Sequence, residues 1–349
     1  MNGVNALAPS EPAEGVRVLV TGGTGFLGAH LVRRLVSENA RVRVLVRSSA
    51  KARQLLTGAQ VVVGDITDES AVATSLEGVS VVFHLAGRLL VPGVPSAEYH
   101  RTHVEGTRLL LSHCRRKPGL NRFVHCSTTG VLGPTGDFPA DESAPVRPTN
   151  VYEATKAAAE AVVRNAWLDD FPAVVVRPGL IYGPGDLHLL GFFRSVLRRR
   201  FRPIGDQPVQ LHPIYIDDMI EALISCARSP AAAGECFHIA GRECVPLAVL
   251  AEAIARAGGT SLPPGRIPLS AARALAFLGD RLPPDLRRSA PLTRSRLDFL
   301  THSRVYDVGK AQRLLDFAAP TDLSTGITTT VAWYREQGYL PRARATVDG

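Results

Sequence analysis

A tyrosine and a lysine four residues apart are the side chains in this sequence best suited to acid–base chemistry. Tyr152 and Lys156 lie in the run Tyr-Glu-Ala-Thr-Lys, near the start of a predicted helix over 151–167. Residues four apart on a helix share one face. A free phenol has a pKa near about 10, and a fixed cation beside it lowers that pKa. The pair could therefore give a proton to a ketone or take one from an alcohol.

A glycine-rich loop is the second chemical signal. Gly22, Gly25 and Gly28 are spaced three apart, directly after an apolar run and before a helical pattern. Glycines let a turn close tightly and let the backbone approach a pyrophosphate, whose charge then faces a helix N-terminus. Because strand, loop and helix follow in the required order, we predict dinucleotide binding here in preference to an ordinary turn.

The end of the next predicted strand bears on the choice of cofactor. An acidic residue there holds the adenosine ribose of NAD, whereas an arginine can meet the 2′-phosphate of NADP. The sequence has Arg47 and Ser48 at this place, with Lys51 close behind. This favours NADP, with NAD as the alternative, although an ordinary surface arginine would look the same.

The elements that must position these residues alternate along the first half of the chain. Strands are predicted at 16–21, 41–46, 60–64, 79–85, 122–127 and 173–177, and helices at 68–76, 99–114 and 151–167. Apolar strands alternating with helices indicate a parallel sheet covered on both faces. The predicted fold class is α/β, a doubly wound parallel sheet (Rossmann fold) with a smaller C-terminal α+β substrate domain.

The expected domain limits follow from where this alternation begins and ends. We expect a flexible tail at 1–15, a dinucleotide-binding domain at 16–185, a substrate domain at 186–340 and a second tail at 341–349. Short strands predicted at 213–216 and 236–239 suggest that about 212–240 returns to the first domain.

Composition excludes several other classes of protein. The net charge is +8, but the positive charge is spread over many arginines with few aromatic residues between them, so nucleic acid is not an expected partner. Five cysteines without C-x-x-C spacing favour a reducing cytoplasm and argue against a zinc site; no metal is expected. The fairly apolar residues 267–279, interrupted by Arg273, predict a packed helix or, alternatively, a helix that touches a membrane without inserting stably.

Taken together and in order, these motifs resemble the extended short-chain dehydrogenases/reductases, the superfamily that includes NAD-dependent sugar epimerases and dehydratases. The resemblance runs from about residue 16 to about residue 340. Its further pieces are Gly64-Asp-Ile, His84-Leu-Ala-Gly, His125-Cys-Ser-Thr, Arg177-Pro-Gly-Leu-Ile-Tyr-Gly-Pro-Gly-Asp, Ile214-Tyr-Ile-Asp-Asp and Tyr306-Asp-Val-Gly-Lys-Ala.

The resemblance implies roles at the matching positions. Tyr152 would donate or accept the proton, Lys156 would hold the nicotinamide ribose, and Thr128 would hydrogen-bond the reacting oxygen, with Ser127 as the neighbouring candidate. Cofactor contacts are expected at Gly22, Thr24, Gly25, Phe26, Leu27, Gly28, Arg47, Ser48, Asp65, Ile66, Leu85, Ala86, Gly87, Ser127, Tyr152, Lys156, Pro178, Leu180 and Ile181. The expected substrate contacts are Thr129, Gly130, Leu189 and Phe193.

Two further expectations come from the resemblance. The family usually has asparagine where this chain has His103, which puts a proton relay through that position in doubt. Many relatives form homodimers by pairing the helices that correspond to 99–114 and 151–167 across a two-fold axis, so a homodimer is expected here.

Local residues favour one branch of the family. Dehydratases resemble one another in placing Asp-Glu after the active-site threonine, where this chain has Thr129 and Gly130. Epimerases typically carry an asparagine soon after the sixth strand, and this chain has none at that place. The run around 174–190 looks most like 3β-hydroxysteroid dehydrogenases and dihydroflavonol reductases. We therefore expect an NADP(H)-dependent ketone reductase or alcohol dehydrogenase with an apolar, steroid-, polyketide- or lipid-like substrate. A nucleotide-sugar 4-epimerase and a non-catalytic NADP sensor are the alternatives.

Overall fold

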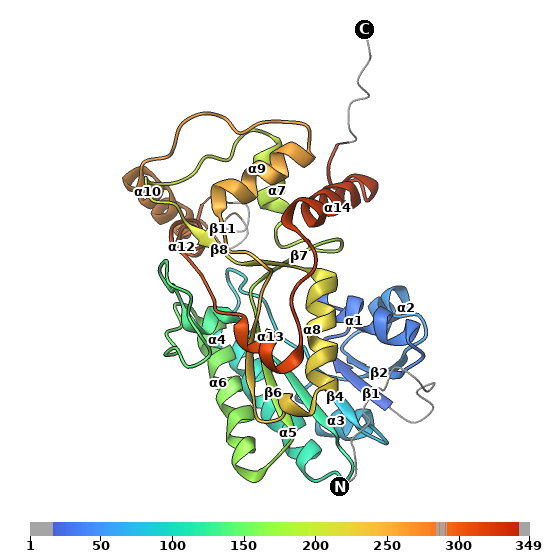
Figure 1. Cartoon of the computed structure of the whole chain (residues 1–349). Helices are drawn as coiled ribbons and strands as arrows, with labels where there is room; N and C mark the ends of the chain where they lie inside the picture. The colour runs from blue at the N-terminus through green and yellow to red at the C-terminus, as the bar shows by residue number, and fades with distance from the viewer. Residues whose placement is uncertain (1–16, 284–285, 287–289, 291, 342–349) are drawn as a thin grey trace.

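The computed structural model describes residues 17–283, 286, 290 and 292–341 (Figure 1). The tail predicted at 1–15 lies outside the described residues, as does all but the first residue of the tail predicted at 341–349.

Seven parallel strands form the central sheet, in the order β10-β6-β5-β4-β1-β2-β3. The order reverses between β1 and β4, and ligands of such sheets bind at the carboxyl ends of the strands beside this reversal. The predicted doubly wound sheet is thereby confirmed. Its strands are β1 (Arg17–Thr21), β2 (Arg41–Val46), β3 (Gln60–Val63), β4 (Val81–His84), β5 (Arg122–Cys126), β6 (Ala173–Pro178) and β10 (Cys236–Ile239).

Alternate strand residues enter two hydrophobic cores, one on each face of the sheet. In β1, Val18 and Val20 join one core and Leu19 the other, as the two-residue period of a strand requires. The first core is completed by α1 (Phe26–Ser37) and α8 (Ile216–Arg228). The second lies under three helices on the opposite face, α3 (Glu69–Ser75), α5 (Gly106–Arg115) and α6 (Val151–Asn165).

Shorter elements complete the part of the chain around the sheet. Immediately before α5, the chain forms a π-helical turn over Arg101–Glu105, within the single long helix that the sequence predicts at 99–114. The remaining elements here are α2 (Ser49–Leu55), α4 (Ser96–His100), α13 (Gly309–Leu315) and the 3-10 turns Thr129–Leu132, Ala166–Asp169 and Pro230–Ala232.

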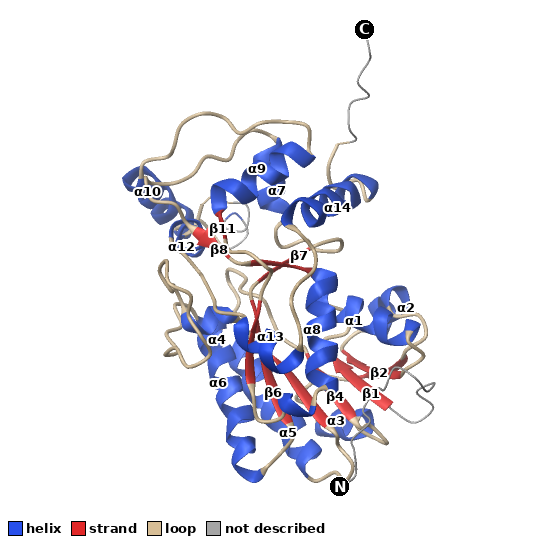
Figure 2. Ribbon diagram, viewed as in Figure 1, coloured by secondary structure: helices blue, strands red, loops and turns tan. Residues whose placement is uncertain are grey.

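A second lobe of mixed structure sits over the carboxyl ends of the strands (Figure 2). Two small sheets pair β7 (Leu180–Tyr182) with β9 (Pro213–Tyr215), and β8 (Gln210–Leu211) with β11 (Val245–Pro246). No helix in the part of the chain that the structure describes is long and apolar enough to cross a membrane. The helices of this lobe are α7 (Leu190–Leu197), α9 (Leu247–Ala257), α10 (Leu269–Asp280), α12 (Arg294–Thr301) and α14 (Leu323–Glu336).

A buried ion pair fastens α6 to the sheet. Glu160 on α6 and Arg177 on β6 are 3% and 1% exposed, and two hydrogen bonds of 2.6 and 3.0 Å join them. Ser127, directly after β5, donates to the same carboxylate at 2.9 Å, and Arg164 lies 2.9 Å from it. One carboxylate thus joins the helix to two neighbouring strands.

Removal of this carboxylate should cost far more stability than loss of a surface charge. Glu160→Ala leaves the Arg177 guanidinium buried without its partner, and breaking a buried pair in this way costs about 3–5 kcal/mol. Asp169→Asn is the matched control, because its pair with Arg115 is exposed and is worth at most about 1 kcal/mol. Urea unfolding measures both. Equal destabilisation by the two variants would contradict the structural role of Glu160.

Candidate functional site

The glycine loop lies at the carboxyl end of β1, at the reversal of strand order. Gly22 has φ +72°, and a Cβ there would come within 2.7 Å of the Leu85 carbonyl oxygen at the end of β4. At Gly28 a Cβ would lie 2.3 Å from the Gly22 carbonyl oxygen. Both positions therefore require glycine, and the turn they allow brings the loop backbone against the first turn of α1.

The N-terminus of α1 is available to an anion. Gly25 is its N-cap, no side chain caps it, and no acidic residue lies in its first turn. The unpaired N–H groups and the helix dipole favour a phosphate at such a place. Thr24, Phe26 and Leu27, three of the expected cofactor residues, adjoin this N-cap in the chain.

The expected adenosine-binding corner lies at the ends of β2 and β3. Arg47 is exposed directly after β2, and Ser48 is the N-cap of α2, where its hydroxyl accepts from the Lys51 N–H. Partial burial raises the pKa of Asp65, but hydrogen bonds from Thr67 and the charges of Arg101 and Arg47 outweigh this and lower it. Arg47 thus lies near enough to Asp65 to act on its charge. Next to Asp65, the buried Ile66 packs against α5 at Gly106.

The segment after β4 connects the glycine loop to the acid–base residues. The Ala86 N–H donates to the Thr21 hydroxyl at 3.2 Å, and the Leu85 N–H donates to the Thr21 carbonyl oxygen. A Cβ on Gly87 would lie 3.4 Å from the Lys156 ammonium. The three predicted cofactor residues 85–87 therefore run from the glycine turn to Lys156.

Tyr152, Lys156 and Thr128 come together at the carboxyl end of β5. Asn150 caps α6 by accepting the Glu153 N–H at 3.0 Å. The Lys156 ammonium, in the next turn after Tyr152, donates to the Cys126 carbonyl oxygen at 2.8 Å. The Thr128 side chain, two residues beyond Cys126, lies near enough to the Tyr152 hydroxyl to lower its pKa. One helix face and one strand end thus supply the three residues predicted to be catalytic.

Electrostatics keep the phenol of Tyr152 protonated in the protein alone. Burial raises the pKa of Tyr152, and the nearby Thr128 side chain opposes this only in part. Burial also lowers the pKa of Lys156. The acidifying effect of Lys156 that the sequence suggests therefore does not dominate here. A neutral phenol beside a threonine hydroxyl is arranged to donate a proton.

The hydroxyls on either side of Thr128 point elsewhere. Ser127 donates to Glu160, so its side chain serves the ion pair that holds α6 and is turned away from the place of the Thr128 hydroxyl. Thr129 is buried and donates to the Pro178 carbonyl oxygen at 2.9 Å. Its hydroxyl is thus engaged within the fold. Gly130 follows, with its N–H donating to the Thr128 hydroxyl oxygen at 3.1 Å.

His103, in the π-helical turn, uses both ring nitrogens within the fold. Its Nε2 accepts the Arg88 N–H at 2.9 Å, which leaves the proton on Nδ1, 2.8 Å from the Thr155 hydroxyl. Burial lowers the pKa of His103 to about 3, so the ring is neutral near pH 7. The ring lies edge-on to Tyr152, with centroids 5.7 Å apart. His103 therefore positions residues on α6 and after β4, and neither nitrogen is free to relay a proton.

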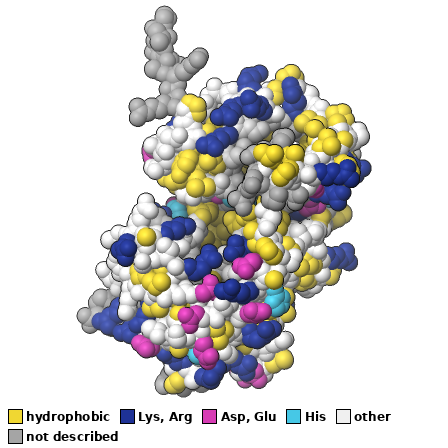
Figure 3. Space-filling view, turned by 180° about the vertical axis from the view of Figure 1, so that it is seen from behind, with side chains coloured by type: hydrophobic (Ala, Val, Ile, Leu, Met, Phe, Trp, Pro, Cys, Tyr) yellow, Lys and Arg dark blue, Asp and Glu magenta, His cyan; other side chains and the backbone are white. Residues whose placement is uncertain are grey.

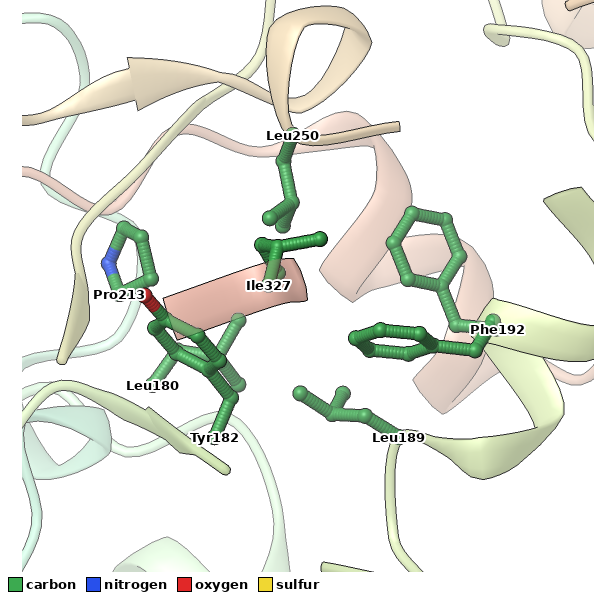
Figure 4. A pocket seen from close by; sticks show the side chains of 8 residues that line it. Leu180, Tyr182, Leu189, Phe192, Pro213, Leu250 and Ile327 are labelled. Carbon is green, nitrogen blue, oxygen red and sulfur yellow. The ribbon is translucent and has the colours of Figure 1, made fainter. Parts of the chain in front are cut away.

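An apolar pocket lies beyond the turn that follows β6. Pro178 ends β6, and Leu180 and Ile181 begin β7. Figure 4 shows Leu180 facing side chains from α7, α9 and α14 across the pocket, and the space between them is too narrow for a water molecule. Leu189 and Phe193, predicted as substrate contacts, line the same pocket but are only 8% and 1% exposed. They belong to the core in this conformation.

Several residues that build the site were given no role in the sequence analysis. Glu160 and Arg177 hold α6 in place, and the Cys126 carbonyl oxygen orients Lys156. The Nε2–H of His30 donates to the Pro184 carbonyl oxygen at 2.8 Å and so joins α1 to the loop before α7. The sequence offers one signal for Glu160, because it follows Lys156 by four residues, just as Lys156 follows Tyr152. Among the described residues, no cluster of histidine, cysteine and acidic side chains could hold a metal ion.

Comparison with known proteins agrees with this geometry. Residues 18–240 match the NAD dependent epimerase/dehydratase family. A 4-hydroxy-2-methyl-3-oxo-4-farnesyl-3,4-dihydroquinoline-1-oxide ketoreductase of Stigmatella aurantiaca is 32% identical, over 89% of this chain and 95% of its own length. A 2-alkyl-3-oxoalkanoate reductase of Stenotrophomonas maltophilia is 31% identical, over 89% of this chain and 97% of its own.

Solved structures agree on the fold. The crystal structure of UDP-glucuronic acid 4-epimerase from Bacillus cereus, in complex with UDP-glucuronic acid and NAD, has a TM-score of 0.73 at 22% identity. It covers 92% of this chain and 100% of that one, and at this identity it shows the fold alone. The family match and the similarity to the two reductases lead to one conclusion. The chain belongs to the NAD dependent epimerase/dehydratase family and is an oxidoreductase of the extended short-chain dehydrogenase/reductase type.

Proposed function

We propose that this enzyme transfers a hydride between NADP(H) and a ketone or secondary alcohol on an apolar substrate, with Tyr152 as the proton donor or acceptor. The observation that carries the proposal is the meeting of three groups at one strand end: a protonated Tyr152 phenol, the Thr128 hydroxyl beside it, and the buried Lys156 ammonium. A ketone oxygen placed between the two hydroxyls would receive one hydrogen bond and one proton.

The residues present fit a nicotinamide dinucleotide. The cradle of Gly22 and Gly28, which a Cβ would fill, and the uncapped N-terminus of α1 would hold the pyrophosphate. When bound, the nicotinamide supplies or accepts the hydride. Lys156 lies within reach of residues 85–87 and would hydrogen-bond the nicotinamide ribose, while Thr128 and Tyr152 orient the carbonyl and quench the charge that develops on its oxygen.

Arg47 supports NADP over NAD. It is exposed directly after β2, where the adenosine ribose is expected, and its charge already acts on Asp65. Its guanidinium would make charge-assisted hydrogen bonds to a 2′-phosphate.

An apolar ketone is the substrate class we propose. Both reductases named above act on oxo compounds that carry hydrocarbon groups. In this chain the pocket beside Leu180 is lined by apolar side chains, including Leu189 and Phe193. That pocket would have to widen by movement of α7 or α14 to accept a substrate. No carboxylate follows Thr128 for a dehydratase reaction, and both Tyr152 and Lys156 are present, unlike the usual pattern of a non-catalytic sensor.

Three broader expectations accompany this proposal. We propose residues 16–185 with about 212–240 as the cofactor domain and 186–340 as the substrate domain, since β10 pairs with β6 and α8 packs under the sheet. We propose cytoplasmic function as well. We also propose a homodimer through α5 and α6, where Ala154, Ala158 and Ala161 are exposed along one face of α6 and would permit close helix pairing.

Loss of the Tyr152 hydroxyl should greatly slow turnover without loss of cofactor binding. Tyr152→Phe keeps the ring but removes the proton, so kcat for reduction of a 2-alkyl-3-oxo ester should fall roughly 10²–10⁴-fold. The NADPH dissociation constant, measured by fluorescence titration, should change little. Tyr339→Phe, which removes the hydroxyl of a tyrosine that packs against Trp333 of α14, is the matched control and should retain full activity. A Tyr152→Phe enzyme as active as the control would refute the role of Tyr152.

Reversal of charge at Arg47 should reverse the cofactor preference. Arg47→Asp removes a hydrogen bond to a charged group, worth about 1.5–3 kcal/mol, and adds repulsion to the 2′-phosphate. Calorimetry should find tighter binding of NADPH than NADH to the natural enzyme and the opposite order in the variant. Arg53→Asp, on the exposed side of α2, makes the same change in net charge and should leave the preference intact. Equal affinity of the natural enzyme for both nucleotides would count against NADP.

A further inference from the structure

Helix α10 has its large apolar side chains on the outside and its small ones on the inside. Ala272, Ala276 and Gly279 are buried, and they face a small separate core that includes Leu292. A Cβ on Gly279 would lie 2.1 Å from the Leu292 carbonyl oxygen, so the helix is packed closely along this side. Apart from Leu269 in the first turn, which packs against this core, the packing of α10 needs none of its leucines or its phenylalanine.

The exposed leucines at the end of this helix form an apolar stripe, with Phe277 beside it. Leu275, Phe277 and Leu278 are 49%, 40% and 60% exposed, and Leu282 just after the helix is also exposed. The spacing of Leu275, Leu278 and Leu282 places them on one face of a helix. Isolated exposed leucines are ordinary on protein surfaces, but a stripe of this kind marks an interaction site.

Arginines border this stripe. Arg273 and Arg281 are exposed on either side of Phe277, and the Arg281 guanidinium lies 3.8 Å from the centroid of its ring. The described residues between 261 and 300 include five arginines, two aspartates and no lysine or glutamate. Figure 3 shows hydrophobic and basic side chains side by side on this lobe, seen from behind. The surface around α10 is thus both apolar and positively charged.

We propose that α10 docks this protein on the surface of an anionic lipid bilayer. The helix is 12 residues long, or about 18 Å, which is too short to span the hydrocarbon core and long enough to lie in the interfacial plane. Leu275, Leu278 and Leu282 enter the acyl boundary, and the arginines pair with lipid phosphates. A second copy of the same face fits poorly, because two arginine-bordered surfaces would repel each other.

This docking surface is connected to the catalytic lobe through α12. After α12, the chain continues to Val305, whose N–H donates to the Thr135 hydroxyl at 2.7 Å, and to Tyr306, which bridges to Ala140. Residues 135–140 lie a few residues beyond Thr128 and Gly130. A membrane-bound α10 would therefore hold the substrate side of the enzyme toward the bilayer. Membrane docking goes beyond the proposed reaction and does not depend on it.

Co-sedimentation of the full chain with lipid vesicles tests the proposal. We expect binding to phosphatidylcholine vesicles that contain about one quarter phosphatidylglycerol, and weaker binding to phosphatidylcholine alone or at raised salt. Leu275→Gln combined with Leu278→Gln should lower the partition coefficient at least about tenfold, and Arg273→Gln with Arg281→Gln should lower it several-fold on anionic vesicles only. Leu168→Gln and the pair Arg33→Gln/Arg53→Gln are exposed controls elsewhere and should bind like the natural protein.

Two outcomes would overturn the proposal. One is a natural protein that stays in the supernatant with anionic vesicles, or a double leucine variant that binds as well as its control. The other is concentration-dependent self-association in sedimentation velocity that the double leucine variant abolishes, which would assign the stripe to a second copy. Reduction of a water-soluble ketone by the double leucine variant should be unchanged, so failure of the catalytic proposal is separable from failure of docking.

Discussion

The attachment of α6 to the sheet through buried charges is the constraint on which the catalytic geometry depends. Tyr152, Lys156 and Glu160 are spaced four apart on one face of this helix. Glu160 is held by Arg177 of β6 and by Ser127 after β5, and Lys156 is held by the Cys126 carbonyl oxygen. These bonds leave the helix little freedom to slide or turn relative to β5. The distance between the Tyr152 hydroxyl and Thr128 is therefore set by charges that face the sheet.

Burial of these charges has a physical cost that the arrangement offsets locally. A carboxylate and a guanidinium taken out of water lose several kcal/mol each, unless hydrogen bonds replace their hydration. Glu160 accepts from Arg177 and Ser127 and lies beside Arg164, so its oxygens are satisfied on all sides. The Lys156 ammonium donates to the Cys126 carbonyl oxygen and lies beside Gly87. The ammonium can therefore still donate a hydrogen bond to a ribose, whereas the oxygens of Glu160 are already fully bonded.

Much of the framework could be predicted from periodicity and glycine spacing, because both reflect local backbone constraints. The strands and the loop of Gly22 and Gly28 are examples. The partners of buried polar groups could not be predicted, because they depend on distances between residues far apart in the chain. Ser127 and Thr128 look equivalent in sequence, yet strand alternation sends one hydroxyl to Glu160 and the other to Tyr152. Likewise, both ring nitrogens of His103 form hydrogen bonds within the fold, to the Arg88 N–H and the Thr155 hydroxyl.

The roles of residues in the substrate lobe were even harder to predict from the sequence. Leu189 and Phe193 have the composition of pocket residues, but in this lobe a core and a pocket are lined by the same side chains, and only packing distinguishes them. For α10, the apolar composition predicts a packed helix. The structure shows that Ala272, Ala276 and Leu269 do the packing while Leu275 and Leu278 remain outside, and hydrophobicity alone cannot reveal this difference.

The fate of the nicotinamide hydride tests the central claim most directly. NADPH deuterated at the nicotinamide C4, prepared as each epimer in turn, is incubated with the enzyme and a 2-alkyl-3-oxo ester, and the product is examined by mass spectrometry. The account predicts that one of the two epimers delivers one deuterium to the new carbinol carbon for each NADPH oxidised. An enzyme that converts its substrate with no net oxidation of NADPH, and with no deuterium in the product, would contradict it, because an epimerase returns the hydride to its own intermediate.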